Sequence, residues 1–129
     1  MKSLIAKTNY YSIEVDKGNN RAYLGIFGYC KSTDDVPNLL NDVEKAASQL
    51  GNGFTLLTDV SQMKTHPQDV SALHIESQKI WVKNGLAKTA EVLPNSAVDR
   101  MALGHRSRTS GMTAKGFEDI QKAEAWLDE

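Results

Sequence analysis

The first third of the chain alternates hydrophobic and polar residues as the strands of an antiparallel hairpin do. Residues 10–16 place tyrosine, isoleucine and valine on one face and serine, glutamate and aspartate on the other, a pattern typical of a half-buried strand. Residues 21–29 are apolar on both faces, which predicts a strand inside the sheet. The residues between them, KGNN, favour a tight turn because glycine and asparagine tolerate positive φ. Residues 1–9 predict either a frayed start or a short edge strand.

Beyond the hairpin the pattern changes to alternating helices and strands. Residues 36–50 carry apolar side chains at spacings of three and four, so we expect a helix that is capped by Ser32 or Thr33 and ends at Gly51. Residues 53–60 form a nearly continuous apolar run, as expected for a strand that is covered on both faces. The next expected elements are a helix ending near Asn84 and Gly85, with Val70, Leu73, Ile80 and Trp81 on one side, and a strand over residues 86–93, with Lys88 and Glu91 partly open to water. The last are a helix capped by Asn95 or Ser96 that uses Val98, Met101, Ala102 and His105, a short strand through Lys115, and a closing helix that packs Ile120, Ala123 and Leu127.

Together these elements predict an α/β fold in a single domain that covers residues 1–129. A hairpin followed by alternating strands and helices implies a mixed β-sheet, with parallel strands joined by right-handed crossovers and helices packed on the sheet. The composition, with 40% hydrophobic and 24% charged residues, is that of an ordinary globular domain that can bury a core. The single cysteine, Cys30, excludes an intrachain disulfide.

The charge and the hydropathy of the chain narrow the classes of partner. The formal net charge of -1 gives no general attraction to nucleic acid or to anionic membranes, so we expect no nucleic-acid partner. No apolar run is long enough for a signal peptide or a membrane span, so we expect a cytoplasmic protein without an integral membrane segment.

The stretch GFTLLTDVSQMKTHPQD, residues 53–69, is the most informative part of the sequence. Its strand is expected to end at Asp59 and to deliver Asp59 and Ser61 into a loop, at the edge where ligands bind in open α/β sheets. Thr65-x-x-Gln68 has the pattern of a capping box, with Pro67 in the first helical turn. The structural alternative is that Asp59 accepts hydrogen bonds in the turn and that the two hydroxyls form turns and caps.

The element order, the LLTDVSQM segment and the closing F-E-D-x-x-x-A-x-x-W-L pattern resemble the STAS-type fold (sulfate transporter and anti-sigma factor antagonist), in particular its SpoIIAA-like branch of small stand-alone bacterial proteins. The resemblance covers residue 10 to the end. In anti-sigma factor antagonists the central strand ends in a D-L-S-type triplet, which Asp59-Val60-Ser61 matches. A phosphorylatable serine then opens the next helix, but this chain has Pro67-Gln68 there, and Thr65 is the nearest hydroxyl. The resemblance implies a regulatory module, with binding of small or lipid-like molecules as a family-level alternative.

The histidines and one basic cluster are the remaining candidates for chemistry. His66 and His74 are eight residues apart, about two helical turns, and not at the i, i+4 spacing of helical zinc sites, so we expect no metal. Arg106 and Arg108 follow His105 in the one compact basic cluster, which suits an anionic group or an acidic partner. The alternative is that these charges only favour a helix C-terminus.

Neither a Ser–His–Asp arrangement nor a pair of carboxylates with catalytic spacing is evident, so we expect a protein that is not an enzyme and has no cofactor. The expected function is a regulatory or binding module that presents residues 59–69 and the following helix to a protein partner or a small ligand. The alternative is a small-molecule or lipid carrier, with an apolar pocket between the sheet and the helices that contain Trp81 and Trp126. An exposed edge strand would also favour a homodimer. The expected contact residues are Asp59, Ser61, Thr65, His66, Arg106 and Arg108.

Overall fold

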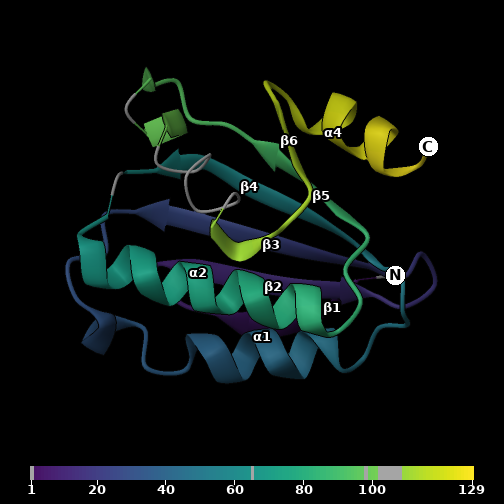
Figure 1. Cartoon of the computed structure of the whole chain (residues 1–129), viewed down its shortest axis with the longest axis horizontal. Coiled ribbons are helices and arrows are strands. Elements are labelled where there is room, and N and C mark those ends of the chain that lie inside the picture. Colours follow the sequence, from purple (N-terminus) through teal and green to yellow (C-terminus); the bar gives the residue numbers. More distant parts are fainter. Residues whose placement is uncertain (1, 65, 98, 102–108) are drawn as a thin grey trace.

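The computed structural model describes residues 2–64, 66–97, 99–101 and 109–129, and in this part of the chain six strands form one sheet in the order β1-β2-β3-β4-β5-β6 (Figure 1). The strands are β1 (Ser3–Lys7), β2 (Tyr11–Asp16), β3 (Arg21–Gly28), β4 (Thr55–Met63), β5 (Lys88–Val92) and β6 (Ala114–Phe117). The sheet is accompanied by the 3₁₀ helix η1 (Thr33–Asp35) and by the helices α1 (Leu39–Ala47), α2 (Gln68–Lys83) and α4 (Ile120–Leu127). Residues 97 and 99–101 are helical as well.

The sheet is mixed, as the sequence predicts. β1, β2 and β3 pair in antiparallel fashion, and β3 to β6 are parallel. The hairpin turns at residues 17–20, where Asn20 adopts a positive φ of 52°. The start of the chain is an edge strand, β1, and so the second of the two alternatives for residues 1–9 is correct.

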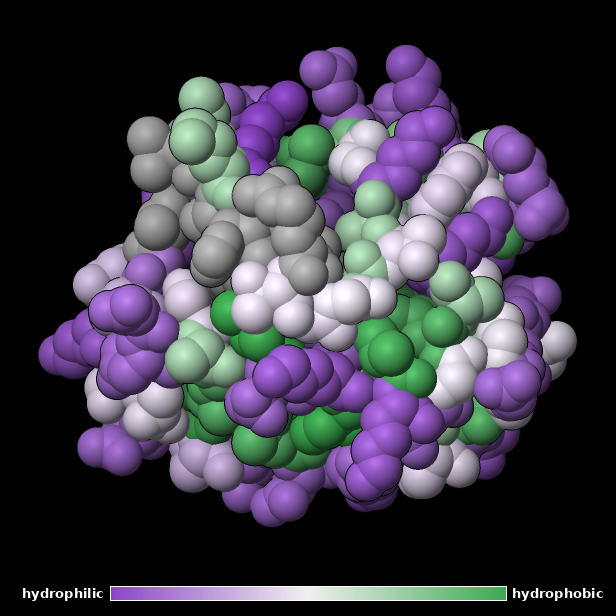
Figure 2. All heavy atoms as spheres, viewed as in Figure 1, coloured by the Kyte–Doolittle hydropathy of each residue, from purple (hydrophilic) through white to green (hydrophobic). Residues whose placement is uncertain are grey.

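Helices lie on both faces of the sheet but cover them unequally. α1 and α2 pack side by side on one face, which we call the α1/α2 face, and α4 packs on the other, which we call the α4 face (Figure 1). Because successive residues of a strand point to opposite faces, Leu56 joins the core under α1 and α2 while Leu57 joins a smaller cluster under α4. Figure 2 shows hydrophobic residues around α2 interrupted by hydrophilic side chains.

The first helix is shorter than its periodicity predicts. Ser32 caps only the 3₁₀ turn η1, where its hydroxyl accepts a hydrogen bond of 3.1 Å from the amide of Asp34. Pro37 has no amide hydrogen and disfavours a helical conformation at the residue before it, so α1 begins two residues later, at Leu39. The helix ends at Ala47 and does not reach Gly51.

Two predictions about the parallel strands are wrong in detail. β4 does not end near residue 60 but continues to Met63, because β3 runs on beside it and pairs with Gln62 and Met63. β5 is partly open to water at Lys88, as predicted, but not at Glu91, which is only 6% exposed because the strand lies between β4 and β6 and is covered on both faces.

The later elements follow the predicted order. β6 includes Lys115, and in α4 the residues Ala123 and Leu127 are buried while Ile120 stays 47% exposed. The side chain of Ser96 accepts a hydrogen bond of 3.4 Å from the amide of Asp99, as a helix cap would. The parts of that prediction that concern Val98, Ala102 and His105 lie outside the described residues. Within the described residues no helix has the length and hydrophobicity that a membrane crossing requires.

Candidate functional site

Asp59 lies inside β4, at a bulge, and not in a loop after the strand. Across from it, β3 advances two residues, from Gly25 to Phe27, while β4 advances three, from Asp59 to Gln62. Asp59 Oδ1 accepts hydrogen bonds from the amide of Ser61 at 3.1 Å and from its hydroxyl at 2.7 Å. Asp59 therefore accepts local hydrogen bonds, as the structural alternative predicts, and the Asp59–Ser61 pair stabilises the bulged backbone.

The rule that placed a ligand at the end of this strand does not apply to this sheet. Crevices form in open α/β sheets where the strand order reverses and the flanking helices go to opposite faces. Here the strands follow one another in sequence order, and α1 and α2 lie on the same face. A site that includes Asp59 therefore cannot be a crevice at the carboxyl end of β4 and must be formed in another way.

The other residues predicted around this segment have different surroundings. His66 is buried, at 6% exposure, and its ring stacks on that of His74 with centroids 5.2 Å apart and an angle of 13° between the planes. The eight-residue spacing did not indicate this contact, because His66 precedes α2 and helical spacing does not apply to it. Pro67 is the N-cap of α2 and therefore precedes the first helical turn. The predicted capping box depends on Thr65, which the structure does not describe. Thr65, Arg106 and Arg108 lie outside the described residues.

The described part of the chain contains no group of three or more His, Cys, Asp or Glu residues that could hold a metal. Cys30 is buried, and burial raises the pKa of its thiol. A thiol in such surroundings is a weak nucleophile.

A hollow of about 230 Å³ lies on the α4 face, and Asp59 is part of its wall. Its lining combines carboxylates with aromatic and aliphatic side chains from three strands, from α4 and from the start of the chain. The lining residues are Lys2, Ser12, Glu14, Tyr23, Leu24, Gly25, Phe27, Leu57, Asp59, Ile120 and Glu124.

The hollow exists because α4 is short and Gly25 has no side chain. α4 contains eight residues and packs on β4, β5 and β6, beside the exposed parts of β2 and β3. A Cβ atom at Gly25 would lie 2.9 Å from the ring of Phe27 and 3.1 Å from the hydroxyl of Ser12. The side chain of any other residue at this position would therefore occupy the space at the base of the hollow. A glycine inside an otherwise apolar strand is the signal in the sequence that could have indicated a hollow here.

The electrostatic character of the hollow is mixed but mainly acidic. Glu14, Asp59 and Glu124 are its carboxylates, and Lys2 is its one basic lining residue. Burial, followed by the charge of Glu124, raises the pKa of Tyr23. The ammonium of Lys2 lies 3.9 Å from the centre of the Tyr23 ring, a distance typical of a cation–π contact. Sequence reasoning missed Glu14, Tyr23 and Glu124 because only the tertiary structure brings them beside Asp59.

Comparison with known proteins gives the fold and no activity. No protein-family model matches the chain, and no curated protein matches it. Among solved structures the chain is similar to the crystal structure of an uncharacterized protein from the DUF3478 family of Shewanella loihica PV-4, which has a SpoIIAA-like fold. The similarity covers 95% of this chain and 97% of that chain, with a TM-score of 0.67 and 14% sequence identity. The chain therefore has a SpoIIAA-like fold, which confirms the fold class that its element order predicted.

Proposed function

We propose that the protein is a non-catalytic binding module of the STAS-like type, and that its ligand site is the hollow on the α4 face. The observation behind this proposal is the lining of the hollow, in which Glu14, Asp59 and Glu124 stand beside Tyr23 and Phe27. Sites for small molecules are concave, largely apolar and supplied with a few polar groups that orient the ligand. At about 230 Å³ the hollow suits a single side chain or a small molecule.

The chemistry of the lining favours a ligand with an alkylammonium group. Carboxylates attract a cation, and the face of an aromatic ring stabilises one further. Lys2 shows that an ammonium fits against Tyr23, since its Nζ atom already lies 3.9 Å from the ring centre. Such a group could come from a lysine side chain of a partner protein or from a small organic amine.

The proposal keeps part of the predicted contact set and changes its surroundings. Asp59 contributes a charge to the hollow, and Ser61 orients that carboxylate through its two hydrogen bonds. His66 is buried against His74, so the proposal does not include it among the residues that line the hollow.

The carrier alternative gains no support from the cavity beside Trp81. Trp81 lies in the core of the α1/α2 face, whereas Trp126 packs in the small cluster on the α4 face, so the two rings cannot line one pocket. The cavity beside Trp81 measures about 10 Å³, which is room for one water molecule and not for an acyl chain.

Titration followed by ¹H–¹⁵N NMR tests the proposal. Butylammonium or a short lysine-containing peptide should shift the amide signals of residues around the hollow, and salt should weaken the effect. Asp59→Asn should reduce the affinity about three- to tenfold, because it removes one charge but keeps an oxygen that can accept the Ser61 hydrogen bonds. Glu44→Gln is the matched control, since it removes an exposed carboxylate on α1, on the opposite face, and should leave the affinity unchanged.

The two cationic probes also distinguish the source of the ligand. Saturable binding of the peptide without binding of butylammonium indicates a protein partner, and the reverse indicates a small amine. The proposal fails if neither probe shifts these signals, or if Asp59→Asn binds as the unchanged protein does.

A further inference from the structure

The buried face of α2 is unusually polar for a helix that packs on a sheet. Its buried residues are Val70, His74, Ser77 and Trp81. The strands beneath it also present polar side chains, including the buried Thr58 and Glu91. Burying polar groups costs free energy unless each finds a hydrogen-bond partner, so we expect every donor and acceptor in this interface to be paired.

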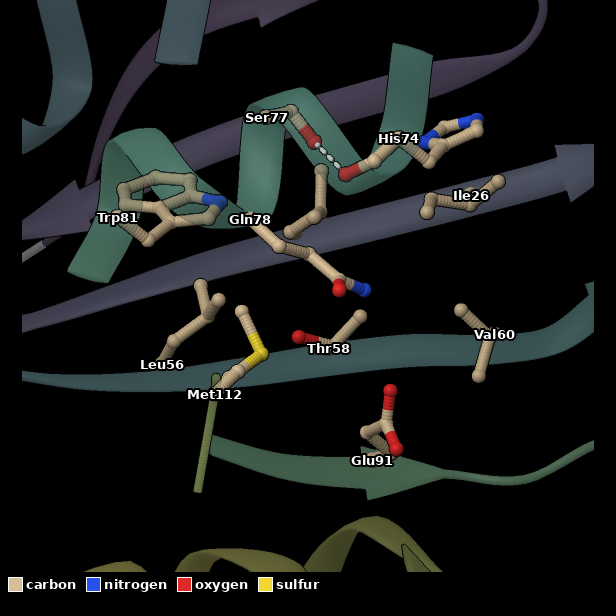
Figure 3. Close-up of a pocket in the computed structure, with 11 residues that line it drawn as sticks. Ile26, Leu56, Thr58, Val60, His74, Ser77, Gln78, Trp81, Glu91 and Met112 are labelled. Atoms are coloured by element: carbon tan, nitrogen blue, oxygen red, sulfur yellow. Dashed lines mark hydrogen bonds between the residues drawn. The ribbon is translucent and has the colours of Figure 1, made fainter. Parts of the chain in front are cut away.

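A small cavity lies in the middle of this interface. Its volume is about 10 Å³, close to the least that one water molecule needs. Thr58 and Glu91 line it from the sheet, and Ser77, Gln78 and Trp81 line it from α2 (Figure 3). A water molecule is stable in such a space only when two or more polar groups bind it.

Trp81 contributes a hydrogen-bond donor that has no partner among the described residues. The side chain is 0% exposed, and its Nε1 atom makes no hydrogen bond there. An indole N–H can only donate, so its partner must be an acceptor. The ring of Phe54 packs against the indole, with centroids 5.9 Å apart, which restrains it from turning elsewhere. Figure 3 shows the indole nitrogen on the side of the ring that faces the other lining residues.

The hydroxyl oxygen of Thr58 is available as a hydrogen-bond acceptor, because the hydrogen bonds of the neighbouring Thr89 show where the hydroxyl hydrogen of Thr58 goes. The hydroxyl of Thr89 donates its one hydrogen to the carbonyl oxygen of Leu56, at 2.9 Å. In the 3.0 Å contact between the two threonine hydroxyls, Thr58 must therefore be the donor. The hydrogen of Thr58 is thus committed to Thr89, and its oxygen can only accept from a group in the cavity.

We propose that this cavity is a binding site for one internal water molecule, which accepts a hydrogen bond from Trp81 Nε1 and donates one to Thr58 Oγ1. The carboxylate of Glu91 lines the same cavity, and its several lone pairs make it the acceptor for the second hydrogen of the water. The ligand is no larger than one water molecule, because the volume admits nothing bigger. The water joins α2 to the sheet and completes the hydrogen bonding of a tryptophan that would otherwise be buried unsatisfied.

Water–protein NMR spectroscopy tests this site. The indole Hε1 of Trp81 should show a dipolar cross-peak at the water frequency with the sign of a long-lived contact in NOESY and ROESY spectra. Thr58→Val keeps the shape of the side chain and removes the acceptor, so this cross-peak should be lost. Thr113→Val, at an exposed position outside the cavity, is the matched control and should leave the cross-peak intact.

Two results would overturn the inference: an unchanged protein without the cross-peak, or a Thr58→Val variant that folds and retains it. If Thr58→Val does not fold, a high-resolution crystal structure of the unchanged protein decides the matter. Density for a water within hydrogen-bond distance of both Trp81 Nε1 and Thr58 Oγ1 supports the site, and an empty cavity rejects it.

Discussion

The two faces of this sheet are made from the same strands yet differ in what covers them. On the α1/α2 face, two helices bury a continuous cluster that includes Ile13, Leu24 and Leu56. On the α4 face, one short helix buries a cluster of five residues and leaves a hollow with Glu14 and Asp59 beside it. The comparison indicates that the first face supplies most of the stability, while the second face has room for a ligand.

Two adjacent leucines of β4 give the largest expected effect and compare the faces directly. Leu56 is 0% exposed on the α1/α2 face, and Leu57 is 4% exposed on the α4 face. Leu56→Ala should lower the free energy of unfolding by about 3–5 kcal/mol, because the cavity forms between a sheet and two helices that cannot close it. Leu57→Ala should cost about 2 kcal/mol, since α4 can move toward the gap.

Urea unfolding of both leucine variants, followed by circular dichroism, measures this difference. Equal losses would show that α4 holds its face as firmly as α1 and α2 hold theirs, and the comparison would then fail. Leu4→Ala, at a residue 61% exposed on the edge strand β1, is a control that should change the free energy of unfolding little.

The attachment of α4 to the sheet predicts a smaller effect. The guanidinium of Arg21 donates a 2.7 Å hydrogen bond to Asp128 just beyond α4 and a 2.9 Å hydrogen bond to the hydroxyl of Thr55. Arg21→Met should cost about 1–2 kcal/mol, a value kept low because the Asp128 side chain is 69% exposed and can return to water. Asp128→Asn should cost less than about 1 kcal/mol.

Hydrogen exchange locates this effect. Amides of α4 should exchange faster in Arg21→Met, whereas amides of α1 and α2 should be unchanged. Uniform acceleration across all helices would mean that α4 does not open separately from the rest of the domain.

Two tyrosines, one on each face, predict a small effect on stability that depends on pH. Burial and the 2.6 Å hydrogen bond to Asp42 raise the pKa of Tyr11 above its ordinary value of 10.0. The folded state holds the phenolic proton of Tyr11 more tightly than the unfolded state does. The contribution of this group to the free energy of unfolding is therefore complete below about pH 10 and is lost as the pH rises above it. Between pH 10 and 11 the free energy of unfolding should fall by about 1 kcal/mol through this group.

Tyr11→Phe isolates this contribution. The variant should flatten the alkaline loss of stability, as measured by urea unfolding at pH 9, 10 and 11. Burial and the charge of Glu124 also raise the pKa of Tyr23, but Tyr23 is only half-buried, so Tyr23→Phe should flatten the loss less. A larger effect at Tyr23 than at Tyr11 would reverse the ranking of the two faces.

Much of the fold could be predicted from local patterns. The alternation in residues 10–16 fixes which side of β2 is buried, and the turn residues 17–20 fix its antiparallel partner. Boundaries were less predictable: Pro37 delays α1, and β4 extends to Met63 because a neighbouring strand accompanies it. In both cases backbone hydrogen bonding overrides the side-chain pattern. Pro37 lacks the amide hydrogen that a longer α1 would use, and β4 continues because its backbone pairs with β3, a distant segment.

The candidate site was predictable only in part, because its residues are far apart in the sequence. Asp59 stands out beside an apolar run, but nothing local indicates that Glu14 and Glu124 line the same hollow. In the same way, a spacing of eight residues along one helix argues against contact between His66 and His74, yet His66 lies before α2 and the two rings stack.

By itself the sequence determined the order of the elements and the buried face of β2, because these follow from the two-residue and 3.6-residue periods of strands and helices. Only the tertiary structure decided which polar residues meet. The bulge at Asp59, the hollow over Gly25 and the polar cavity at Trp81 each depend on how strands and helices from distant parts of the chain pack together. Packing of that kind is a property of pairs of elements, and no single segment contains it.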